Sequence, residues 1–105
     1  MSERMRIELY VAAPPTSKCK QAIALAERAV EAYPEQLKLV VYGRGMPRSE
    51  PPTLGFHRAG KVRPVPSAWV NGVLVAWGEV PDAERMRRVI EGELSKGKLA
   101  PLSRI

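Results

Sequence analysis

The sequence predicts a single α/β domain, and three patterns indicate this fold class. An apolar strand, an amphipathic helix and a second apolar strand follow one another over residues 6–42, which is the order of a βαβ unit. Asn71 and Gly72 lie between two apolar runs and predict a β-hairpin, because both positions of its tight turn need a positive φ. A final helical pattern starts near Asp82. With 105 residues, the chain has room for one core.

Composition and charge narrow the classes of function. We expect no membrane contact and a cytoplasmic protein, because the chain has no apolar run of about 18 residues and its charged N-terminus lacks the core of a signal peptide. The single cysteine cannot form an internal disulfide, and with a single histidine it argues against a metal site. We expect no cofactor. The formal charge of +6 favours anionic partners.

The βαβ unit is predicted from residues 6 to 42. Its first strand, at residues 6–12, turns wholly apolar at its end, as strands in the centre of a sheet do. The two prolines that follow end this strand, since proline donates no hydrogen bond to a ladder. Apolar residues recur at three- and four-residue steps over residues 17–33 and predict a helix there. The second strand, at residues 37–42, should then pair with the first in parallel.

The second half of the chain is predicted as a loop, a short helix, the hairpin and a final helix. Glycine and proline are frequent over residues 44–52, which predicts the loop, and the short helix follows at residues 53–59. Asp82 is the expected N-cap of the final helix. We expect the core of the domain to span residues 6–94 and the tail, residues 95–105, to be loose.

The hairpin fixes which side chains should face one another. A two-residue turn at Asn71 and Gly72 would pair the flanking strands without a register shift. The predicted pairs are Val70 with Val73, Ala68 with Val75, and Pro66 with Trp77. Trp77 should therefore flank whatever Pro66 approaches.

The order of these elements, with Val65, Pro66 and Ser67 directly before the hairpin, resembles the thioredoxin fold. The three residues look like the cis-proline loop of thioredoxin and glutaredoxin-like proteins. Residues 76–82 resemble the turn into the last helix of small bacterial and archaeal redox-active disulfide proteins. The resemblance covers residues 6–94 and implies a four-stranded mixed sheet flanked by two long helices and one short helix.

The chain departs from this family where the family carries Cys-x-x-Cys, because Thr16-Ser17-Lys18-Cys19 occupies that position. Thiol–disulfide exchange needs an exposed thiolate to attack and a second thiol to resolve the mixed disulfide. Thr16 cannot replace the first cysteine, since an alcohol is hardly ionised near neutral pH. We expect Thr16 to cap the helix by accepting a hydrogen bond from the Cys19 amide, with the orientation of a substrate as the alternative.

Cys19 is the candidate catalytic thiol, and opposite influences act on it. The helix N-terminus, Lys18 and Lys20 would lower the pKa of the thiol, whereas burial on the apolar stripe would raise it. Cys19 is thus either an inert core residue or a reactive thiol. Thr-x-x-Cys also resembles the peroxidatic motif of peroxiredoxins, in which an arginine assists the thiolate; Arg44 or Arg63 would be that arginine.

Three functions follow from these observations. The main hypothesis is a non-catalytic module that docks a peptide or protein at Val65, Pro66 and Ser67, with Trp77 beside them. The first alternative is a one-thiol oxidoreductase that acts through Cys19 on disulfides, glutathione or peroxide. The second is an anion or nucleic-acid surface over the basic residues 43–64, although nucleic acid is not expected because no aromatic residues interleave there.

Overall fold

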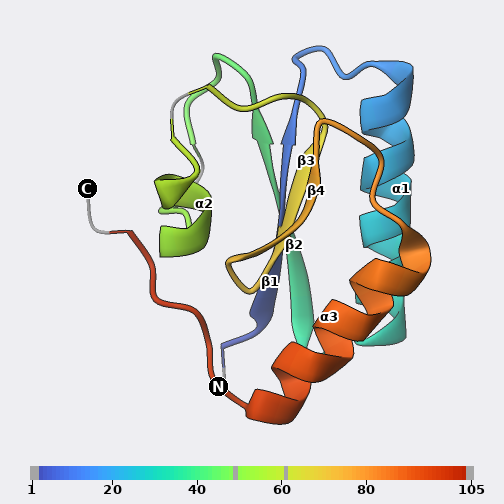
Figure 1. Ribbon diagram of the computed structural model, residues 1–105, viewed down its shortest axis with the longest axis vertical. Coiled ribbons are helices and arrows are strands. Elements are labelled where there is room, and N and C mark those ends of the chain that lie inside the picture. Colours follow the sequence, from blue (N-terminus) through green and yellow to red (C-terminus); the bar gives the residue numbers. More distant parts are fainter. Residues whose placement is uncertain (1–2, 49, 61, 104–105) are drawn as a thin grey trace.

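The computed structural model describes residues 3–48, 50–60 and 62–103. Within these ranges, four strands form one mixed sheet and three helices pack on it (Figure 1). The strands are β1 (Met5–Val11), β2 (Leu37–Gly43), β3 (Ser67–Val70) and β4 (Val73–Trp77), and the helices are α1 (Ser17–Ala32), α2 (Leu54–Arg58) and α3 (Ala83–Lys96). The predicted four-stranded mixed sheet is confirmed.

The strand order is β2-β1-β3-β4, with β1 at the centre. The strand β1 pairs in parallel with β2, from Met5 opposite Leu37 to Val11 opposite Gly43. It pairs antiparallel with β3, where Tyr10 lies opposite Ser67. The helices α1 and α3 cover one face of the sheet, and α2 lies on the other (Figure 1).

The face under α1 and α3 holds the aliphatic core. Alternate residues of β1 point to this face, and Ile7 and Leu9 are completely buried. The side of α1 that faces the sheet is made of small residues, which lets the helix approach closely. Its buried members are Cys19, Ala22 and Ala26.

The face under α2 is aromatic and polar. The rings of Tyr42 and Trp69 lie against Phe56 of α2, with centroid separations of 4.5 and 4.6 Å. The helix also packs on the hairpin turn, because a Cβ atom on Gly55 would lie 1.9 Å from the carbonyl oxygen of Gly72. This contact requires glycine at position 55.

The hairpin turn is confirmed, but its predicted register is wrong beyond Trp69. Asn71 and Gly72 have φ values of 50° and 78°. A β-bulge between Ala68 and Trp69 then shifts the pairing, so that Ser67 lies opposite Trp77. Because the extra residue changes which face each side chain meets, Trp77 stands against the ring of Trp69 at 6.3 Å rather than opposite Pro66.

Two helix ends also differ from the prediction. The helix α1 ends at Ala32, since the amide of Tyr33 bonds back to Ala29 and Val30 as a cap. The helix α3 continues to Lys96, where Gly97 ends it in the left-handed conformation with φ 68°. Asp82 caps its start, as predicted.

The segment after α3 is held against α2 rather than projecting freely. The Leu54 amide donates to the carbonyl of Pro101 at 2.9 Å, and the Ser103 amide donates to that of Pro52 at 2.7 Å. Asn71 also accepts a hydrogen bond from the Ala100 amide at 2.7 Å. The backbone of residues 100–103 is thus hydrogen-bonded to α2, to the residues before it and to the hairpin turn. The composition of this segment does not reveal these contacts. In the part of the chain that the structure describes, no helix combines the length and the apolar character needed to cross a membrane.

Candidate functional site

Thr16 and Cys19 form the start of α1 as predicted. The Cys19 amide donates to the Thr16 hydroxyl oxygen at 3.2 Å, and Thr16 has the extended backbone of an N-cap. The Thr16 side chain is exposed, whereas Cys19 is 0% exposed. The cap therefore faces solvent while the thiol points into the core.

The Cys19 sulfur is engaged by the backbone as well as by packing. The Ala12 amide donates to Sγ at 3.5 Å. Burial raises the pKa of the Cys19 thiol, but hydrogen bonds from Thr16 and Ala12 and the charge of Arg44 together outweigh it, so that the pKa lies below its ordinary value. The cation that acts on the sulfur is Arg44 rather than Lys18 or Lys20, which are exposed.

The loop before β3 lies at the same end of the sheet as Cys19. The Val65–Pro66 peptide bond is cis, and so is the Ala13–Pro14 bond. Val65 packs against the aliphatic cluster that contains Cys19, and the Pro66 side chain is fully buried. The structure thus brings Val65 and Pro66 to the turn that leads into α1.

The backbone of Val65 is left open. Its N–H and C=O groups make no hydrogen bond to any residue within 3–48, 50–60 and 62–103. Its neighbour Ser67 is tied down, since its hydroxyl donates to the Pro64 carbonyl at 2.8 Å and accepts from the Gly78 amide at 3.1 Å. The backbone groups of Val65 are therefore unpaired, two residues from a Ser67 side chain that is fixed by two hydrogen bonds.

Trp77 lies opposite Ser67 rather than opposite Pro66. It is 45% exposed, and its ring lies edge-on to Trp69, on the aromatic face of the sheet. The register shift at the bulge separates it from Pro66, so the predicted surface of Pro66 and Trp77 is not formed by direct pairing.

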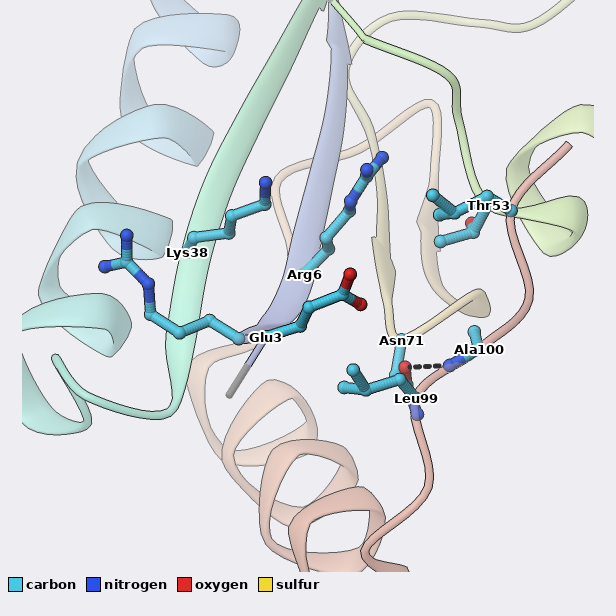
Figure 2. Close-up of a pocket in the computed structure, with 9 residues that line it drawn as sticks. Glu3, Arg6, Lys38, Thr53, Asn71, Leu99 and Ala100 are labelled. Atoms are coloured by element: carbon cyan, nitrogen blue, oxygen red, sulfur yellow. Dashed lines mark hydrogen bonds between the residues drawn. The ribbon is translucent and has the colours of Figure 1, made fainter. Parts of the chain in front are cut away.

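A pocket of about 410 Å³ lies where β1 and β2 begin (Figure 2). Figure 2 shows residues of these strands on one side and the hairpin turn with the C-terminal segment on the other. Its lining includes Arg6, Lys38, Thr53, Asn71, Leu99 and Ala100. Two of its three lining cations are already paired, because one Glu50 oxygen lies 2.8 Å from Arg6 and 2.9 Å from Lys38. The third, Arg4, donates a hydrogen bond to the Pro34 carbonyl at 3.4 Å.

Buried charge on the α2 face was missed by the sequence reasoning. Glu8 is 0% exposed and accepts hydrogen bonds from the Tyr42 hydroxyl at 2.7 Å, the Thr53 amide at 3.0 Å and the Thr53 hydroxyl. Burial and this carboxylate raise the pKa of Tyr42 well above its usual range. Arg63 is 5% exposed and lies over Phe56. Arg63 lies in the basic residues 43–64, where the sequence pattern does not indicate a buried side chain.

The comparisons with known proteins add no family to this geometry. No protein family model matches the chain, and no curated protein matches it either. Among the described residues, no group of three or more histidine, cysteine, aspartate or glutamate side chains is placed to hold a metal ion.

Proposed function

We propose that the protein is a thioredoxin-like domain that binds an extended segment of another protein at the Val65 loop and performs no thiol catalysis. The observation that carries this proposal is the open peptide group of Val65. An unpaired backbone donor and acceptor at the surface is what an added strand needs, since main-chain hydrogen bonds supply affinity in β-augmentation.

The position of the loop supports binding at this end of the sheet. Ser67 pairs with Tyr10, so Val65 lies two residues beyond the ladder, where β1 leaves the sheet. The nearby turn is open, because Pro14, Pro15 and Thr16 are all exposed. A bound segment would therefore run over rigid, proline-fixed backbone, which lowers the entropy cost of binding.

The burial of Cys19 supports the absence of thiol catalysis. A nucleophilic thiolate must reach its substrate in line, whereas the Cys19 sulfur is enclosed by the core and bonded to the Ala12 amide. The hydrogen bonds that lower the pKa of the Cys19 thiol also hold its sulfur in position. A one-thiol reaction would require the start of α1 to open first.

Amide hydrogen exchange tests the binding proposal directly. We expect the Val65 amide to exchange rapidly in the free protein and to be protected at least about tenfold when a short, capped peptide of alternating threonine and glutamine is added. The matched control is the same peptide with proline in place of threonine, which has fewer backbone donors and should give no protection. Unchanged exchange at Val65 under saturating peptide, or equal protection by both peptides, would contradict the proposal.

Thiol labelling tests the absence of catalysis. We expect a thiol-specific disulfide reagent at pH 7 to react with Cys19 at least about a hundredfold faster in denaturant than in buffer, because the sulfur is reached only after opening. Fast labelling of the folded protein, with an apparent pKa well below about 8.5, would favour the one-thiol alternative.

A further inference from the structure

Three arginines line up along two aromatic rings on the α2 face of the sheet. The guanidinium carbon of Arg63 lies 4.2 Å from the centre of the Phe56 ring and 5.7 Å from that of Tyr10. Arg48 lies over Phe56 at 5.5 Å, and Arg44 lies over Tyr10 at 6.0 Å. We call Arg44, Arg48 and Arg63 the arginine cluster. Its members stand side by side, with Arg63 sharing one ring with each of the others.

Backbone hydrogen bonds fix two members of the cluster in place. Arg63 donates from Nη2 to the Phe56 carbonyl at 2.9 Å. Arg44 donates from Nη2 to the Arg63 carbonyl at 2.9 Å, and its own amide donates to the Val11 carbonyl at 2.8 Å. The cations are thus held before any ligand arrives, which lowers the cost of binding.

The nearby acids form no ion pair with the cluster. Glu50 pairs with Arg6 and Lys38, and the Glu8 carboxylate accepts hydrogen bonds from Tyr42 and Thr53 while its charge acts on Arg63 from a distance. Among the described residues, no carboxylate lies within ion-pair distance of Arg44, Arg48 or Arg63.

Arg63 shows the resulting imbalance. Its Nε atom is buried and has no hydrogen-bond partner in the described part of the chain. Burial lowers the pKa of its guanidinium and the charge of Arg48 lowers it further, against smaller opposing effects of Tyr10 and Glu8. Like charges held close together raise the local positive potential, which attracts an anion.

We propose that the arginine cluster binds a phosphate-bearing small anion, of the phosphomonoester or diphosphate class. Arg44 and Arg48 are exposed and would contact the phosphate oxygens, for which the guanidinium fork is suited. Arg63 is a positioning residue that holds Arg44 through its carbonyl and adds positive potential behind the ligand. Three cations over two neighbouring rings offer a small anion a short set of contacts, whereas a long polymer needs a stripe of them.

Calorimetric titration with inorganic pyrophosphate tests this site. The double variant Arg44→Gln/Arg48→Gln should bind pyrophosphate at least about tenfold more weakly than the unmodified protein, as expected for lost charge-assisted hydrogen bonds. The matched control is Arg85→Gln/Arg88→Gln, which removes the same charge from exposed positions on α3 and should change the affinity less than about twofold. Thermal unfolding of both variants checks that each remains folded.

Three outcomes would overturn the proposal. Equal weakening by the two double variants would mean that pyrophosphate responds to net charge alone. Failure of pyrophosphate to bind at low salt would mean that the cluster is not an anion site.

A second titration uses a single-stranded RNA oligonucleotide in place of pyrophosphate. Tighter binding of RNA than of pyrophosphate, with a steep salt dependence and equal losses in both variants, would replace the compact site with a general polyanion surface.

Discussion

The two faces of the sheet hold their buried side chains by different forces. Under α1 and α3, β1 contributes Ile7 and Leu9 to an aliphatic core, where packing is non-directional. Under α2, the same strand contributes Glu8, which is equally buried but fixed by hydrogen bonds. Neighbouring residues of one strand therefore experience two kinds of interior.

This difference separates structural from functional candidates. A buried aliphatic side chain needs only space that fits it, whereas a buried charge is costly unless its partners are all in place. Cys19 lies on the aliphatic face and is buried in its core cluster. Arg63 lies on the other face, where its buried Nε atom has no hydrogen-bond partner among the described residues.

The largest effect is expected from removing the carboxylate that organises the α2 face. Glu8→Leu introduces an apolar side chain of similar size and leaves the Tyr42 hydroxyl and the Thr53 amide without their acceptor. Each buried donor left unpaired costs about 1–3 kcal/mol, so the free energy of unfolding in urea should fall by about 3 kcal/mol.

The matched change on the other face is Ile7→Val, which removes one methylene group from the aliphatic core and should cost about 1 kcal/mol. Tyr42→Phe gives an intermediate case, because it removes one hydrogen bond and leaves the carboxylate with its Thr53 donors. If Glu8→Leu proved as stable as the unmodified protein, the α2 face would be held by its aromatic packing, and the contrast between the faces would fail.

The sequence predicted the elements that depend on residues close together in the chain. The strands, α1 and the hairpin turn depend on local periodicity and on Asn71-Gly72, and their existence was predicted correctly. The bulge was missed because residues 73–77 form a continuous apolar run with no glycine to mark it. The position of Trp77 was wrong for that reason.

The candidate site was predicted less completely because burial on the α2 face arises from distant segments. Arg6 and Glu8 alternate with apolar residues, a pattern typical of a half-exposed strand. They are covered by α2 and by the loop from Glu50 to Thr53, which lie more than forty positions along the chain. The Thr16 cap, by contrast, is a contact over three residues, and it was predicted correctly.

A smaller effect is expected at two threonines that cap helices on opposite faces of the sheet. Thr16 caps α1, and Thr53 caps α2 by accepting a hydrogen bond from the Phe56 amide at 3.4 Å. Thr16 is exposed, so Thr16→Ala should lower the free energy of unfolding by about 1 kcal/mol, the usual cost of a lost cap. Thr53 is 2% exposed and its hydroxyl also donates to Glu8, so Thr53→Ala should cost about 1 kcal/mol more, because the carboxylate loses a buried donor.

Urea unfolding of the two variants measures the difference. Thr16→Ser and Thr53→Ser, which retain the hydroxyl, should restore most of the loss. Equal costs at the two positions would mean that the hydroxyl contributes only as a cap, and that the hydrogen-bonded carboxylate does not distinguish the α2 face from the aliphatic one.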